Sequence, residues 1–138
     1  MGGNKYKIHY LNKKYEGVIM NYKEVLKEHG TDIEVALLRF CQDEKLYKRF
    51  LERFFRGENV ERIREIYKDE KYQELEIAAH TYKGVCGNLG LSKLQKYFEE
   101  IREKIRKENY ENLEELIEKA LKEKKELGEE LEKSRDWY

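Results

Sequence analysis

Apolar residues recur every three to four positions along most of the chain, and no proline interrupts them. This spacing places each run of apolar side chains on one face of an α-helix. The 138 residues are the length of one domain and are enough to bury a shared core. Short connections between successive amphipathic helices favour antiparallel neighbours. We therefore predict an all-α fold, namely an up-and-down antiparallel four-helix bundle with an additional short N-terminal helix or helices.

Capping residues and glycines divide this pattern into helices. Asn21 with Glu24, and Thr31 with Glu34, are typical of helix N-termini, and Asp43 can cap a third helix. We expect a long helix over 43–68 that bends or breaks near Gly57. The next helix starts at Asp69 and ends at Gly90. Ser92 caps the following helix, and the last helix contains Gly128. The aromatic residues of these faces, Phe50 among them, are expected to lie in the core.

The chain divides into three expected parts: an N-terminal extension over 1–19, a helical bundle domain over 20–132 and a C-terminal tail over 133–138. In the extension, Tyr6, Ile8 and Tyr10 alternate with polar residues, as in a short strand or hairpin. We expect Trp137, in the tail, to fold back on the bundle or to fray rather than to serve as a docking residue.

Charged residues make up 42% of the chain, with 29 basic and 29 acidic side chains. This balance leaves no basic excess for phosphates, so we expect no nucleic acid partner. No apolar run approaches the roughly 18 residues of a membrane span, and no signal-peptide core is visible. We expect a cytoplasmic monomer without membrane contact. Cys41 and Cys86 stand at core spacings and are expected to be reduced thiols.

The segment AHTYKGVCGNLG, residues 79–90, is unusual for the interior of a helix. An interior glycine costs about 1 kcal/mol relative to alanine, yet Gly84 and Gly87 both occur here. At about 100° per residue, His80 points away from the apolar face, and both glycines lie on its side. The glycines therefore remove side chains beside an exposed imidazole. That leaves room for a group on the ring, or for another protein to close over it.

His80 and Lys83 suggest a particular chemistry for this bare face. A neutral imidazole is a competent nucleophile near pH 7. Lys83 lies one turn from His80, where its ammonium could stabilise a transferring phosphoryl group. The geometry suggests a phosphoryl or acyl acceptor; the alternative is a surface histidine with accidental neighbours. Ile77 and Leu91, at about 60° and 20° from His80, are expected to be exposed apolar residues that contact a partner.

The segment from His80 to Gly90, HTYKGVCGNLG, resembles the H-x-L-K-G-x-x-x-N-L-G signature of histidine-containing phosphotransfer (HPt) domains. The similarity covers about residues 20–132. Two positions depart from the family pattern within the motif: Tyr82 replaces the usual leucine, and Cys86 replaces a small residue. Lys71 stands where an acidic residue is common, which bears on partner preference. Tyr82 points toward the core, so we expect only local repacking there.

The resemblance implies a role for each matching residue. His80 would be the phosphoacceptor, Lys83 would stabilise the charge of the phosphoryl group, and Gly84 would provide clearance. Gly87 would belong to the partner-binding face. The phosphoryl group would come from an aspartate of one receiver domain and pass to an aspartate of another, in response regulators or hybrid sensor kinases. Such a protein is a phosphocarrier and not an enzyme. It needs no cofactor, because Mg²⁺ is expected on the receiver domain only.

Two other functions are alternatives to phosphotransfer. The first is a helical interaction module that keeps the fold but is not phosphorylated, and the intact His80, Lys83 and Gly84 argue against it. The second is a metal site. The three histidines and two cysteines show neither C-x-x-C nor H-x-x-x-H spacing, so we expect no metal ligand among them. His29, which lies at an expected helix end, is read as a partner of the helix dipole.

Overall fold

The computed structural model describes residues 19–137, and these residues are almost entirely helical. The predicted strand or hairpin near Tyr6 to Tyr10 lies outside the described residues. The helices are α2 (Tyr22–Glu28), α3 (Ile33–Arg39), α4 (Glu44–Glu52), α5 (Ile63–Lys68), α6 (Tyr72–Leu89), α7 (Ser92–Arg106) and α8 (Leu113–Glu132). Between α4 and α5 the chain forms one π-helical turn, Arg53–Gly57, and one 3-10 turn, Val60–Arg62.

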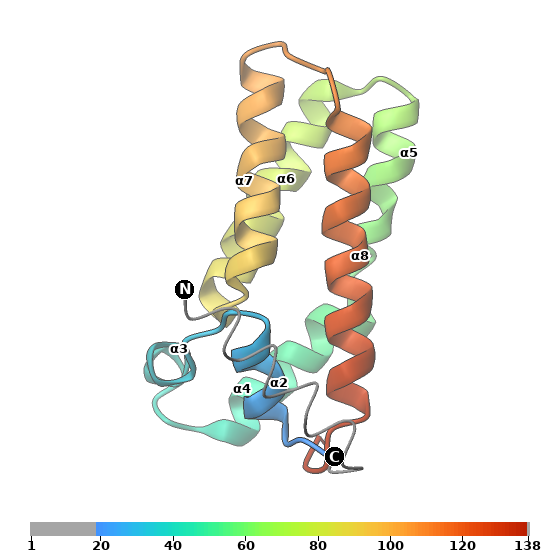
Figure 1. Ribbon diagram of the computed structural model, residues 1–138. Helices are drawn as coiled ribbons and strands as arrows, with labels where there is room; N and C mark the ends of the chain where they lie inside the picture. The colour runs from blue at the N-terminus through green and yellow to red at the C-terminus, as the bar shows by residue number, and fades with distance from the viewer. Residues whose placement is uncertain (1–18, 138) are drawn as a thin grey trace.

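The longest helices lie side by side with alternating directions (Figure 1). Helices α5 and α6 are joined at one end of the molecule, α6 and α7 at the other, and α7 and α8 again at the first. The short helices α2 and α3 precede α4 at the end opposite the α7–α8 connection. Residues 19–137 contain no strand. The predicted all-α bundle with additional short N-terminal helices is therefore confirmed.

The predicted break near Gly57 is also present. The α-helix ends at Glu52 and widens into the π-helical turn, after which Glu58 is extended with φ −91° and ψ 122°. One extended residue redirects the chain, so α5 begins at Ile63 as a separate helix. This break explains why the apolar pattern changes phase after Gly57. The first bundle segment is thus made of α4 and α5 in succession.

The predicted helix caps are confirmed at two positions and wrong at three. Asn21 accepts from the Glu24 amide, and Asp43 from the Leu46 amide, as expected. At the other three positions a neighbouring residue holds the cap position. Asp32 and not Thr31 caps α3. Asp69 ends α5, and Lys71 precedes α6. Ser92 is the first helical residue of α7, and Leu91 precedes it. Thr31 is 5% exposed, because its side chain packs toward Gly90.

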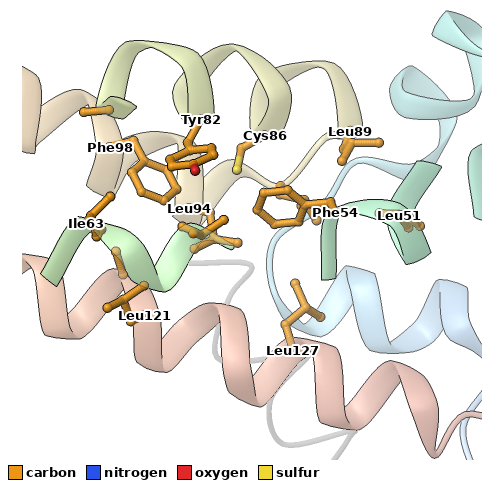
Figure 2. Close-up of a cluster of buried hydrophobic side chains, with 14 of the residues drawn as sticks. Leu51, Phe54, Ile63, Tyr82, Cys86, Leu89, Leu94, Phe98, Leu121 and Leu127 are labelled. Atoms are coloured by element: carbon orange, nitrogen blue, oxygen red, sulfur yellow. The ribbon is translucent and has the colours of Figure 1, made fainter. Parts of the chain in front are cut away.

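One core is shared by side chains from α4 and its π-helical turn to α8. Figure 2 shows the labelled members of this cluster: Leu51, Phe54, Ile63, Tyr82, Cys86, Leu89, Leu94, Phe98, Leu121 and Leu127. Tyr82 lies inside it, as predicted, and its hydroxyl accepts from Arg62 Nε at 2.9 Å. Two expected core residues are exposed. Phe50 is 38% exposed, and Cys41 is exposed in the turn after α3 with φ 54°.

The end of the chain folds back on the bundle. Trp137 is buried, and its ring centroid lies 6.4 Å from that of Tyr22 in α2. The backbone amide of Arg135 donates to the Met20 carbonyl at 2.9 Å. A free docking tail at Trp137 is therefore excluded. None of the helices within residues 19–137 is long and apolar enough to cross a membrane.

Candidate functional site

Helix α6 contains residues 79–89, nearly all of the glycine-containing segment AHTYKGVCGNLG. Its buried face consists of Leu75, Ala78, Ala79, Tyr82, Cys86 and Leu89. His80 is exposed on the opposite face, near the middle of the 18-residue helix. The surrounding turns fix the backbone at this position, while the imidazole remains accessible to solvent. The predicted orientation of His80 is confirmed.

The glycines of α6 differ in what surrounds them. A Cβ placed on Gly84 would have no atom within 4 Å, so the space beside His80 is open. A Cβ on Gly87 would lie 2.9 Å from Gln95 Nε2, the end of a flexible side chain on α7. Gly90 ends the helix with φ 74°, a left-handed conformation that favours glycine. Of the three glycines, Gly84 therefore has the open space that the predicted clearance role requires.

A shallow groove of about 340 Å³ runs along this face of α6. It is lined by Arg39, His80, Lys83, Gly84, Gly87, Asn88 and Gln95. Arg39, at the end of α3, donates from Nη1 to the Gly87 carbonyl at 2.6 Å. The sequence predicts no role for Arg39 or Gln95, since neither the helical spacing nor the histidine motif places them beside α6. The groove brings two cations, Arg39 and Lys83, to the same face as the imidazole.

Lys83 is held on the α7 side of the groove. Its Nζ lies 3.5 Å from Oε1 of Glu99, and the Lys83 side chain is 27% exposed. The long, flexible lysine stem lets the ammonium move between this carboxylate and a group attached to the ring. The structure therefore places the predicted charge-stabilising side chain beside the exposed imidazole.

Ile77 and Leu91 were predicted to be exposed together, and only Ile77 is. The Ile77 side chain is 63% exposed on α6, whereas Leu91 is 2% exposed. The prediction for Leu91 was wrong because α6 ends at Leu89 and Gly90 turns the chain. The Leu91 amide then donates to the Cys86 carbonyl at 2.9 Å, and its side chain joins the core. Leu91 cannot contact a partner.

Comparison with protein families supports the similarity seen in the motif. The family model of the Hpt domain matches residues 45–137, which begins within α4, includes α5 to α8 and contains every residue of the groove on α6 except Arg39. The chain belongs to the Hpt domain family. Hpt domains are phosphotransfer modules of two-component systems; they carry phosphoryl groups and interact with receiver domains. No curated protein and no solved structure matches the chain significantly.

This Hpt domain has a second, apolar groove next to the one at His80. It has a volume of about 610 Å³ and is lined by Arg39, Phe40, Phe50, Arg53, Phe54, Glu58, Val85, Asn88 and Leu89. Arg39 and Asn88 line both grooves, so the two grooves are adjacent. Phe50 is exposed here and not in the core, and it lies 5.5 Å from the ring of Phe40. This groove and the exposed side chain of Ile77 therefore place apolar surface near His80.

The cysteines and the other described histidine of this Hpt domain lie outside the groove. Burial raises the pKa of the Cys86 thiol, so this thiol stays protonated and unreactive at neutral pH. His29 is engaged by two carboxylates, Glu123 and Glu130. Within residues 19–137, no group of three His, Cys, Asp or Glu side chains could hold a metal ion.

Proposed function

We propose that this Hpt domain is an intermediate of a phosphorelay: His80 accepts a phosphoryl group from an aspartate of one receiver domain and passes it to an aspartate of another. The observation that carries the proposal is the open space at Gly84 beside the exposed imidazole of His80. A helix that served only to pack would gain about 1 kcal/mol from alanine at this position. The bare surface is useful only if something approaches the ring.

The chemistry follows from the side chains of the groove. A nitrogen of the neutral His80 imidazole attacks the phosphorus of the phosphoaspartate, and the acyl-phosphate bond breaks to leave a carboxylate. The Lys83 ammonium stabilises the negative charge spread over the transferring oxygens. In the second half the carboxylate of another receiver attacks, and the imidazole leaves. The Mg²⁺ for both halves is assigned to the receiver domain, so the chain acts as a phosphocarrier and not as an autonomous enzyme.

The receiver is proposed to dock over the surface of α6 around His80, from Ile77 to the apolar groove at Phe40 and Phe50. Ile77 lies on one side of His80 along α6, and the groove at Phe40 and Phe50 lies toward the other end. Apolar contact on both sides of the histidine would hold the receiver aspartate over the ring and exclude water. The bare backbone at Gly84 and Gly87 lets the two surfaces approach closely.

The direct test is transfer of label from phosphorylated receiver domains to the chain. We expect an acid-labile, base-stable phosphoryl group on the parent protein and none on His80→Gln, whose helix content should be unchanged because the residue is exposed. Undiminished labelling of His80→Gln would refute the assignment of the phosphoacceptor. A folded parent protein that takes no label from any receiver would instead support the interaction module without phosphotransfer.

A further inference from the structure

The contact between Lys83 and Glu99 belongs to a row of contacts between α6 and α7. In this row Arg106 Nε lies 3.1 Å from Glu76 Oε1, and Lys83 Nζ lies 3.5 Å from Glu99 Oε1. Gln95 lies next to Gly87 in the same row. Because the two helices are antiparallel neighbours, this row fixes Glu99 opposite the turn of α6 that follows His80. The charge partner of Lys83 is thus set by the packing of two long helices.

A phosphoryl group on His80 would change the surroundings of this ion pair. It would bring between one and two negative charges to the turn before Lys83. A single ammonium would then have two anionic partners, and the Glu99 carboxylate and the phosphoryl oxygens would repel each other. The free imidazole has neither effect. The pair therefore favours the unphosphorylated form of the site over the phosphorylated form.

We propose that Glu99 competes with the phosphoryl group for Lys83 and thereby sets the equilibrium of phosphoryl transfer at His80. This inference rests on the proposed function and adds a positioning residue to it: Glu99 acts through Lys83 and not on the reacting atoms. By lowering the stability of phosphohistidine, Glu99 makes His80 a better donor to the next receiver and a poorer acceptor. A carrier that must unload needs such a limit on how tightly it holds its phosphoryl group.

The size of the effect follows from the exposure of the pair. The side chains of Lys83 and Glu99 are 27% and 52% exposed, so solvent screens their attraction. Exposed ion pairs of this kind support a shift of about two- to fivefold in an equilibrium constant. A shift of this size leaves the site functional. It is large enough to measure as a change in the distribution of phosphoryl groups between His80 and the receiver aspartate.

The experiment uses the full chain and a receiver domain that it phosphorylates. Phosphoramidate loads His80: the P–N bond of the reagent breaks, a bond from phosphorus to an imidazole nitrogen forms, and the imidazole proton leaves with ammonia. After removal of the reagent and addition of the receiver with Mg²⁺, phosphorus passes from the imidazole nitrogen to the aspartate oxygen. The imidazole takes up a proton when it leaves. The measured quantity is the ratio of phosphohistidine to phosphoaspartate at equilibrium.

We expect Glu99→Gln to raise this ratio about two- to fivefold over the parent. Glu100→Gln is the matched control, since Glu100 is also exposed on α7 but lies about 100° further around the helix, on the other flank of its buried stripe. It removes the same charge and should leave the ratio within error. A ratio for Glu99→Gln equal to that of the parent or of Glu100→Gln would overturn the inference.

The Lys83→Ala background separates competition for Lys83 from simple repulsion. If Glu99 acts through Lys83, the effect of Glu99→Gln should shrink to less than half when Lys83 is absent. An equal effect in both backgrounds would show that Glu99 acts directly on the phosphoryl group and would refute the positioning role. Unchanged melting temperatures of the variants would exclude a structural cause.

The two proposals fail in different ways. If the parent takes no label on His80 from phosphoramidate or from the receiver, the proposed function fails and the inference fails with it. If the parent is labelled on His80 but Glu99→Gln leaves the ratio unchanged, only the role of Glu99 fails. The label is assigned to His80 by its loss in His80→Gln.

Discussion

At the scale of single residues, the three glycines of residues 79–90 serve three different purposes. Gly84 leaves open space beside His80. The Gln95 side chain packs against Gly87, whose carbonyl accepts a hydrogen bond from Arg39. Gly90 adopts a left-handed conformation that ends α6. Gly90 is constrained twice, because a Cβ there would also lie 3.0 Å from Ala36 Cβ. Packing or geometry accounts for glycine at Gly87 and Gly90, whereas no contact in the structure accounts for it at Gly84.

Substitutions of Gly84 test the clearance role. Gly84→Ala should raise the free energy of unfolding by up to about 1 kcal/mol, because helix propensity improves and the new Cβ contacts nothing. Gly84→Gln should fold equally well and block phosphoryl transfer, since its side chain covers the space beside His80. Chemical denaturation and transfer from a phosphorylated receiver are the two measurements. Transfer by Gly84→Gln at the parent rate would contradict the clearance role.

Lys83 and Ile77 are predicted to have separable roles. Lys83→Ala should slow single-turnover transfer about ten- to a hundredfold, because a charge-assisted hydrogen bond is worth roughly 1.5–3 kcal/mol. It should leave receiver binding nearly unchanged. Ile77→Glu should instead weaken binding, because it places a charge at an exposed apolar position of the proposed docking face. If both variants showed the same defect in binding and in transfer, this division of roles would be wrong.

At the scale of helices, α2 is joined to α8 by a partly buried histidine, His29, at the end of α2. Both oxygens of Glu123 lie 3.0 Å from Nδ1 of His29, and Oε2 of Glu130 lies 2.6 Å from Nε2. Burial by itself would lower the pKa of His29. Hydrogen bonds and charge attraction from the two carboxylates outweigh burial and raise the pKa to about 9. The imidazolium form, which donates from both nitrogens, therefore joins the two helices at neutral pH.

This contact predicts a pH dependence of stability. The pKa of His29 is higher in the folded chain, at about 9, than its usual value of 6.5. The stabilisation is therefore complete below about pH 6.5 and is lost as the pH rises through 9, by up to about 3 kcal/mol. Urea denaturation at pH 6 and at pH 9.5 should show this loss in the parent and a smaller loss in His29→Gln. Parallel pH profiles of the two proteins would contradict the prediction.

At the scale of the whole molecule, the last residues close the bundle beside α2. The Tyr22 amide donates to Asp136 Oδ1 at 2.8 Å, and the Trp137 ring packs against Tyr22. The family match also extends to residue 137. These contacts join segments that are more than a hundred residues apart in the sequence. The predicted division between a bundle over 20–132 and a tail over 133–138 can therefore be tested by measuring how much residues 133–138 contribute to stability.

Trp137→Ala gives that experiment. Because the ring is buried against Tyr22, we expect the free energy of unfolding to fall by about 3 kcal/mol, as for other buried tryptophans. Lys133→Ala, an exposed position in the same segment, should change stability by less than about 0.5 kcal/mol. Equal stabilities of the two variants in urea denaturation would show that 133–138 is a dispensable tail.

The sequence by itself determined what depends on local periodicity. The spacing of apolar residues predicted the long helices and the change of phase after Gly57, and the glycine at position 90 predicted the end of α6. The same spacing placed His80 opposite the buried face, because neighbouring turns of one helix have a fixed geometry. Leu91 shows the limit of this reasoning, because the helical periodicity does not hold at the residue that follows Gly90, which ends the helix.

Contacts between helices were decided only by the tertiary structure. Arg39 beside Gly87, Glu99 beside Lys83 and the carboxylates around His29 each join residues of different helices. Such pairs depend on which helices are neighbours and on how each is rotated, and a helical pattern in one segment carries no information about either. The sequence therefore predicted the exposure of His80 and the bare face around it, while the packing of α3, α7 and α8 decided which charges surround them.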